Sequence, residues 1–207
     1  MKTKEKIIQT SIELFNRQGV VAITTNHIAK ELNMSPGNLY FHFANKEEII
    51  RQIFKNMCKE TYQIWQMSKK KQNILPLDLI EKNFELFWKY RFFHREMHYL
   101  RRKDPQLSKM WKIHLVKIKK LMMVMHRRWV KEGWIQPIQS GEEAEFVSNV
   151  LLSTSSTFFQ FFESSERLPV KKHVESGKKY MARILVPWTS GSMRSEFDKF
   201  ITHHLTQ

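Results

Sequence analysis

Apolar residues recur every three or four positions along almost the whole chain, which is the spacing of one helical face. The first segment shows this with Ile7, Ile8, Ile12 and Phe15, and Gly19 then favours a left-handed stop. The same spacing predicts helices over residues 4–18, 25–32, 36–41, 46–68, 77–102, 107–132, 142–164, 169–186 and 192–205. The pattern therefore indicates an all-α protein.

Capping residues mark the starts of the short N-terminal helices. Thr3 is a candidate cap for the first helix and Thr24 for the second. His27 stands where a capping box needs Glu or Gln, so this box is expected to be incomplete. Ser35 is a candidate cap for the third helix, with Pro36 at its first position, where the missing N–H costs nothing.

The order of the helices predicts a small head and a larger body. Three N-terminal helices form the head, and the long helix over residues 46–68 links it to a helical C-terminal domain. We assign residues 1–55 to the head and 56–207 to the body. A polar link over residues 69–73 and Pro76 mark the start of the helices that belong wholly to the body. The sequence contains no internal repeat.

Residues 24–43 have the pattern of a helix-turn-helix. Two short helices flank a turn of three to four residues, which Asn33 can close because Asn tolerates the left-handed conformation. The second helix would enter the major groove of duplex DNA. Gly37 lets its backbone approach DNA, and Tyr40 can reach a phosphate or a thymine methyl. Its polar face carries Ser35, Asn38 and His42.

These residues resemble the TetR/AcrR family of transcriptional regulators. The resemblance rests on Thr24-Thr25-x-x-Ile28-Ala29 followed by Gly37-Asn38-Leu39-Tyr40-x-His42-Phe43-x-Asn45-Lys46-Glu47-Glu48, and it covers residues 6–54. It implies a homodimer that binds a palindromic double-stranded DNA operator. It further implies a small-molecule effector, here unknown, that binds the C-terminal domain and releases the DNA.

The resemblance also implies which residues contact DNA. By matching position they are Thr24, Thr25, Asn26, Ser35, Pro36, Gly37, Asn38, Tyr40, His42 and Lys46. The sequence departs from the family at Pro36, where Lys or Arg is frequent, and at Phe41, where a second Tyr is common. Pro36 cannot donate to guanine, and Phe41 lacks the hydroxyl for a phosphate contact. Tyr40 packing inside the head and His42 capping the turn are the alternatives to DNA contact.

The body is rich in aromatic residues and methionine. The segments that begin at Leu77 and Leu107 carry more than one apolar face, which is compatible with a lined ligand cavity as well as with an ordinary core. We take as candidates for the ligand-binding wall Phe87, Tyr90, Phe93, His94, Met122, Met125 and Phe158.

The helix over residues 142–164 combines apolar positions with small serines that permit close packing. By resemblance, this helix and the last ones form a two-fold four-helix interface. Intramolecular packing is the alternative, and both can hold on different faces. The candidate interface residues are Phe146, Val147, Val150, Leu151 and Thr154.

Composition adds an unusual charge. The 207 residues have a formal net charge of +15, and residues 101–131 alone hold eleven basic residues and one acid. A solvated helix face, a field that attracts DNA and a surface for an anionic partner all fit this excess. A single Cys excludes a disulfide framework within the chain. The chain has no apolar run of about 20 residues, so we expect no membrane partner and a cytoplasmic protein.

Catalytic signatures are absent from the sequence. It has no Gly-rich phosphate loop and no nucleophile elbow, so we expect neither an enzyme nor a cofactor. His94 and His98 lie one helical turn apart, but Arg95 stands where a zinc protease has Glu, so no metal site is expected. We predict a sequence-specific, ligand-responsive repressor. The alternative is a DNA-binding protein whose body binds another protein instead of a small molecule.

Overall fold

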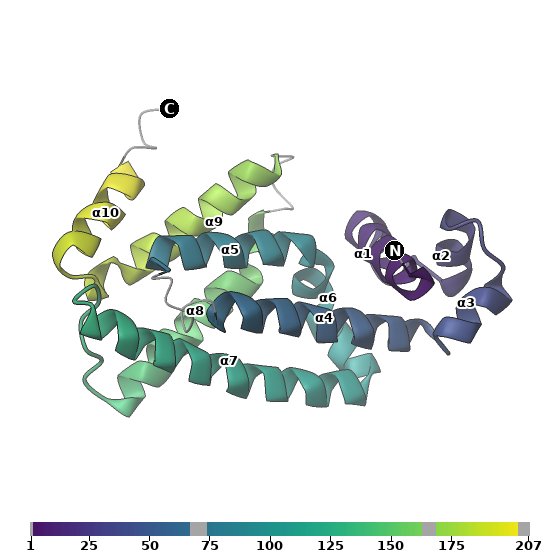
Figure 1. Ribbon diagram of the computed structural model, residues 1–207, viewed down its shortest axis with the longest axis horizontal. Helices are drawn as coiled ribbons and strands as arrows, with labels where there is room; N and C mark the ends of the chain where they lie inside the picture. Colours follow the sequence, from purple (N-terminus) through teal and green to yellow (C-terminus); the bar gives the residue numbers. More distant parts are fainter. Residues whose placement is uncertain (1, 67–73, 163–168, 203–207) are drawn as a thin grey trace. The chain divides into compact units, whose positions relative to one another are not determined.

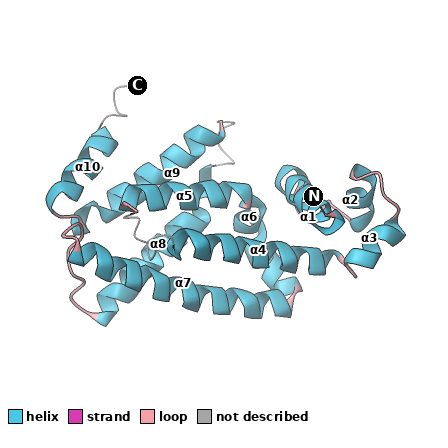
Figure 2. Cartoon of the chain, viewed as in Figure 1, coloured by secondary structure: helices cyan, strands magenta, loops and turns pink. Residues whose placement is uncertain are grey.

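The computed structural model describes residues 2–66, 74–162 and 169–202, and these residues form helices joined by loops (Figures 1 and 2). The helices are α1 (Thr3–Gln18), α2 (Thr25–Glu31), α3 (Pro36–His42), α4 (Lys46–Gln66), α5 (Pro76–Lys89), α6 (Arg91–Lys103), α7 (Pro105–Lys131), α8 (Gly141–Phe162), α9 (Val170–Leu185) and α10 (Gly191–Thr202), with a 3₁₀ turn at Val186–Trp188. Within these ranges, β-type pairing is limited to an isolated bridge between Ile135 and Thr189. The predicted all-α class is confirmed.

Most helix boundaries follow the predicted caps and stops. Asn33 adopts a positive φ of 51° after α2, and Gly133, with φ 72°, follows α7. The first helix differs, because its N-cap is Lys2 and Thr3 is already helical. The predicted helix ends at Ser68, Ser164 and Leu205, together with the polar link 69–73, lie outside the described residues.

The single helix predicted over residues 77–102 is wrong, because the chain breaks at Tyr90 between α5 and α6. Asn16 of α1 satisfies the backbone groups that the break exposes. Its side-chain amide donates to the Lys89 carbonyl oxygen at 2.9 Å and accepts from the Phe92 N–H at 3.0 Å. The Tyr90 hydroxyl donates to Glu60 at 2.7 Å. The break is therefore maintained by partners far away in the sequence.

Two compact units make up the structure, and the first comprises residues 1–60 and 89–112. Its core contains a Phe15–Phe92 pair with ring centroids 5.2 Å apart and a Phe54–Phe93 pair at 5.6 Å. Each buried Phe contributes about 2–3 kcal/mol of hydrophobic stabilisation. Residues 89–112, predicted to belong to the body, thus pack with the N-terminal helices. The functional boundary after residue 55 stays a prediction.

The second unit comprises residues 61–88 and 113–207. One of its apolar clusters joins α5, α8, α9 and α10 through Phe84, Phe158, Met181 and Phe197. Gly177 of α9 lies against the Phe84 ring so closely that an added Cβ would be 2.2 Å from a ring carbon. A second cluster gathers Met125 and Trp129 of α7 with residues before and within α5. No helix in the described ranges is long and apolar enough to cross a membrane.

Candidate nucleic-acid interface

A reciprocal cap starts α2. The His27 N–H donates to the Thr24 hydroxyl oxygen at 3.3 Å, and the Thr24 N–H donates to His27 Nδ1 at the same distance. The imidazole therefore takes the place of the Glu side chain that the sequence lacks. The expectation of an incomplete capping box is wrong for this reason.

The turn between α2 and α3 is built from local backbone contacts. The Met34 N–H donates to the Ala29 carbonyl oxygen at 3.0 Å, while Asn33 takes the left-handed conformation. Ser35 caps α3 by accepting from the Asn38 N–H at 3.2 Å, and Pro36 occupies the first turn. The predicted caps of α3 are thus confirmed, and they set where its exposed face begins.

One face of α3 is buried and the opposite face is open. Leu39 and Phe43 are fully buried, so they anchor the helix in the head. Tyr40 is 49% exposed, and its hydroxyl lies 3.0 Å from the Thr25 hydroxyl of α2. This contact joins two residues predicted to bind DNA and fixes the direction of the Tyr40 ring. Ser35, Pro36, Gly37 and Asn38 are all exposed, and His42 is half-buried.

Lys46 has a structural role that the sequence did not reveal. Its ammonium donates to the carbonyl oxygens of Val20 and Ile23, both at 2.8 Å. Two of its three N–H groups therefore hold the turn that precedes α2. At most one N–H remains for the phosphate contact that was predicted for Lys46.

The same turn is held from the other side by α6. The Val20 N–H donates to Glu96 Oε1 at 2.9 Å. The neighbouring Arg95 donates from Nη2 to the carbonyl oxygens of Phe15 and Asn16, at 3.1 and 2.8 Å, and so caps the end of α1. Sequence reasoning missed Arg95 and Glu96, because their partners lie 76 to 80 residues away.

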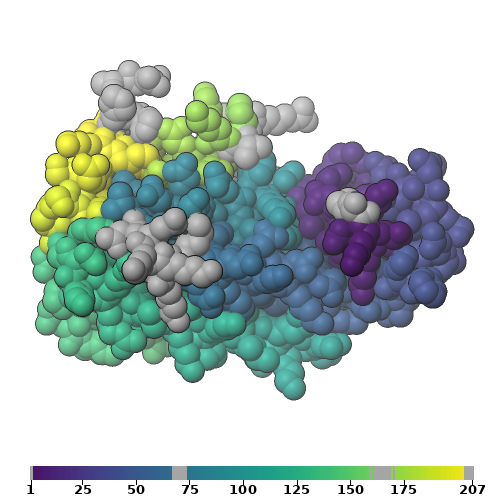
Figure 3. Space-filling model, viewed as in Figure 1, coloured from purple at the N-terminus to yellow at the C-terminus, as the bar shows by residue number. Residues whose placement is uncertain are grey.

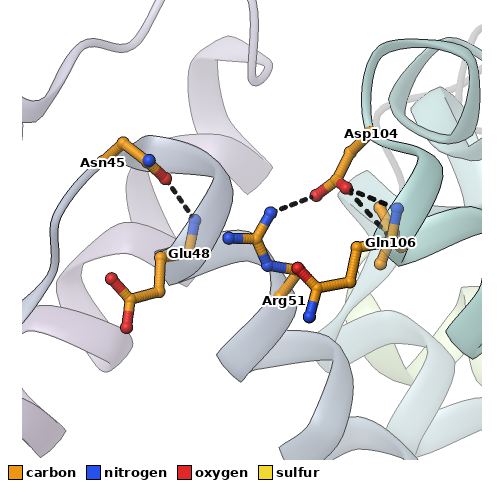
Figure 4. A network of polar contacts seen from close by, with 6 residues as sticks. Asn45, Glu48, Arg51, Asp104 and Gln106 are labelled. Atoms are coloured by element: carbon orange, nitrogen blue, oxygen red, sulfur yellow. Dashed lines mark hydrogen bonds and ion pairs between the residues drawn. The ribbon is translucent and has the colours of Figure 1, made fainter.

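A carboxylate connects α4 to the start of α7 (Figure 4). Asp104 Oδ2 accepts from Arg51 Nη1 at 2.7 Å, and Asp104 Oδ1 accepts from the backbone N–H groups of Gln106 and Leu107 at 2.9 and 3.1 Å. Both side chains are largely buried, at 20% and 10% exposure. Figure 4 also shows Asn45, which accepts from the Glu48 N–H at 2.8 Å at the start of α4. These contacts orient the helix that follows the helix-turn-helix.

The predicted ligand-wall residues are divided between the two compact units. Tyr90, Phe93 and His94 belong to the first unit, where Tyr90 and Phe93 are buried. Phe87, Met122, Met125 and Phe158 belong to the second. Phe87 and Phe158 both contact Phe84, with ring centroids 5.9 and 5.3 Å away. Met125 instead belongs to the cluster around Trp129.

The predicted dimer residues lie on α8 and differ in exposure. Phe146 is 60% exposed, while Val147 is buried. Val150, Leu151 and Thr154 are half-buried, and Leu151 packs against the cluster around Phe84. No group of three or more His, Cys, Asp or Glu side chains in the described residues could hold a metal ion.

Comparison with known proteins gives consistent matches. A sequence model described as bacterial regulatory proteins, tetR family, matches residues 7–53, and one described as bacterial transcriptional repressor matches residues 61–197. A solved TetR-family transcriptional regulator from Marinobacter aquaeolei VT8 is 30% identical, with a TM-score of 0.85 over 97% of this chain and 99% of that chain.

Two further proteins resemble part of the sequence or the fold. The biofilm operon icaADBC negative transcriptional regulator IcaR of Staphylococcus epidermidis is 42% identical over 53 residues, which are 26% of this chain and 29% of that protein. The chain therefore spans less than a third of this curated relative. A complex of SmeT with triclosan shares the fold at 18% identity, with a TM-score of 0.63 over 92% of this chain and 93% of that chain.

These matches name regulators and not enzymes. Because the model for residues 61–197 covers more than half of the sequence and the head matches separately, the chain belongs to the TetR family of bacterial transcriptional regulators.

Proposed function

We propose that this protein is a repressor that binds a palindromic DNA operator as a homodimer, with α3 as its recognition helix. The observation that carries the proposal is the open face of α3, which is capped by Ser35 and anchored by Leu39 and Phe43. IcaR, which matches 26% of this chain, is named as a negative regulator, and this supports repression. In the dimer, the two recognition helices are expected about 34–36 Å apart, one turn of DNA.

The dimer contact is proposed on α8 and the last helices. Phe146 supports this assignment, because its large apolar side chain is 60% exposed and aromatic residues are enriched at subunit interfaces. Val150 and Thr154 follow at helical spacing and are half-buried. A charged residue at Phe146 is expected to weaken the dimer and, with it, binding to both operator half-sites.

A small-molecule effector is proposed for the second compact unit. SmeT, which shares the fold, has been solved with triclosan. Its proposed contacts are Phe87 and Phe158, which pack on Phe84 within the apolar cluster of this unit. An effector would act by binding the conformation that does not bind DNA more tightly, so that the population shifts.

One observation favours the alternative, in which the body binds a protein. The outer face of α7 exposes apolar and basic side chains together, and its helix contains no acid. The exposed members between residues 113 and 131 are Ile113, Val116, Lys117, Lys120, Val124, Arg127 and Lys131. Part of this helix surface is visible in Figure 3, coloured teal to green. An effector that releases operator DNA from the purified protein would favour ligand sensing over this alternative.

The test of the proposed function is selection of bound duplexes from random DNA, followed by gel shift at physiological salt. The selected sequences should be palindromic. Tyr40→Ala should bind them about tenfold more weakly, because it loses a half-exposed side chain of the proposed DNA-binding face, which Thr25 of α2 holds in place. Tyr99→Ala is the matched control, because Tyr99 is similarly exposed at 42% but lies on α6.

Lys46→Ala is a less clean test than Tyr40→Ala, because it would also release the Val20 and Ile23 carbonyl oxygens. Sedimentation of the Tyr40→Ala protein should show an unchanged dimer. Selection of no sequence, or equal DNA affinity of Tyr40→Ala and wild type, would refute the proposal.

A further inference from the structure

The most exposed large apolar side chain in the described residues is Phe41, at 85%. It lies on α3, where successive residues turn by about 100°. Leu39 defines the buried direction of this helix, and Phe41, two residues or about 200° further on, is therefore on the side that faces away from the head. An exposed aromatic ring therefore stands near the C-terminal end of the helix face that is proposed to meet DNA.

Folding of the head does not account for this ring. Its aromatic neighbour is the adjacent His42, whose ring lies edge-on with a centroid 5.3 Å away. The exposed residues beside it on α3 are Asn38, which is polar, and Tyr40, whose hydroxyl contacts Thr25. Single exposed apolar side chains are common on protein surfaces, so the exposure of Phe41 alone does not indicate a partner. Its position on the outward face of α3 is what points to an apolar contact with DNA.

The geometry beside Phe41 permits a close approach to base edges. Gly37 lies one helical turn earlier, and a Cβ added there would meet nothing nearer than the Ser35 hydroxyl at 4.0 Å. The ring thus stands next to uncovered backbone. The Tyr40 hydroxyl contacts Thr25, which fixes that side chain toward α2, whereas the more exposed Phe41 ring has no polar group that directs it to another part of the head.

We propose that Phe41 reads a thymine in each operator half-site through the 5-methyl group; this inference rests on the proposed function of α3. In the major groove, the thymine methyl is the apolar feature that separates T·A from the other base pairs. A phosphate contact does not suit Phe41, because the ring has no N–H or O–H to donate. A contact with the sugar would be independent of sequence, and this difference makes the proposal testable.

The experiment replaces each thymine of the selected operator in turn by deoxyuridine, which removes only the methyl group. Wild-type protein should bind more weakly when the thymine at one position of the half-site is replaced. The loss should be about fourfold for one half-site and about fifteenfold when the symmetric position of the other half-site is replaced as well. Phe41→Ala should lose a similar factor on the thymine operator and should bind both operators equally. Phe41→Tyr keeps the ring and should keep the discrimination.

Folding is checked separately by thermal unfolding, which Phe41→Ala should leave unchanged because the side chain is 85% exposed. Tyr99→Ala serves again as the matched exposed aromatic control and should discriminate like wild type. An operator insensitive to every deoxyuridine, or a Phe41→Ala protein that still discriminates, overturns the inference while the proposed function stands. If Phe41→Ala loses the same factor of affinity on the thymine operator and on the deoxyuridine operator, the Phe41 contact is independent of sequence, and the inference is overturned. Selection of no sequence by wild type would refute the proposed function as well.

Discussion

Replacement of glycine by alanine is expected to have opposite effects on stability at Gly37 and at Gly177. At Gly37, an added Cβ has open space, with its nearest neighbour 4.0 Å away. At Gly177, the Cβ would lie 2.2, 2.3 and 2.8 Å from three carbons of the Phe84 ring. The fold therefore requires glycine at position 177 and does not require it at position 37. DNA is the proposed reason for Gly37.

The magnitudes follow from helix propensity and packing. Alanine is more favourable than glycine in a helix by up to about 1 kcal/mol, so Gly37→Ala should leave stability unchanged or slightly raised. Gly177→Ala gains the same propensity but incurs about 3 kcal/mol of overpacking against Phe84, a net loss of about 2 kcal/mol. For a chain of this length that loss lowers the Tm by roughly 4–8 °C.

Operator affinity should fall for Gly37→Ala and should stay nearly the same for Gly177→Ala. Gly37→Ala places a methyl between α3 and the base edges and should weaken binding by at least about tenfold, or about 1.4 kcal/mol. Gly177→Ala, assayed well below its Tm, should bind within about twofold of wild type. Calorimetry and gel shift on both variants provide the measurements. A Gly37→Ala protein that is destabilised, or that binds its operator normally, would refute the reasoning.

Three further outcomes are expected. Asp104→Ala should lower the free energy of unfolding by about 3 kcal/mol, because it removes the cap of α7 and leaves the largely buried Arg51 without its carboxylate. Urea unfolding measures this change, and a loss below about 1 kcal/mol would contradict the prediction. Burial and the charge of Lys117 lower the pKa of His114 to about 4, so stability present above pH 6.5 is lost as the pH falls from 6.5 toward 4. At pH 5 this loss should be about 2 kcal/mol, and His114→Gln should abolish it in denaturation at pH 5 and 7. The double variant Lys120→Glu, Arg127→Glu should slow DNA association at low salt but not at high salt in stopped-flow assays; equal rates at low salt would show that the α7 charge does not steer DNA.

Local signals in the sequence accounted for most of the head. Helical periodicity, the caps at Thr24 and Ser35 and the left-handed Asn33 act within four residues of the backbone they organise, so they could be read directly. The family motif depends on the same stretch. Even there, the replacement of the capping Glu by the His27 ring follows only from the folded structure, because it depends on a side-chain orientation.

Long-range contacts decided the rest. The break at Tyr90 was invisible in a continuous apolar pattern, since the Asn16 amide that satisfies it lies more than 70 residues away. The distribution of the predicted ligand residues over two units likewise followed from how the helices pack. Periodicity shows that a residue has an apolar face to bury, but not which helix buries it.

The recognition helix α3 combines features set by local sequence with features set by long-range packing. Its position, its caps and its buried anchors follow from short-range chemistry, which the residues around it encode completely. The coupling of Tyr40 to Thr25, the hold of Lys46 on the preceding turn and the outward position of Phe41 depend on the packing of α1, α2 and α3 against one another. Such contacts join groups separated by many residues, so they exist only once the chain has folded.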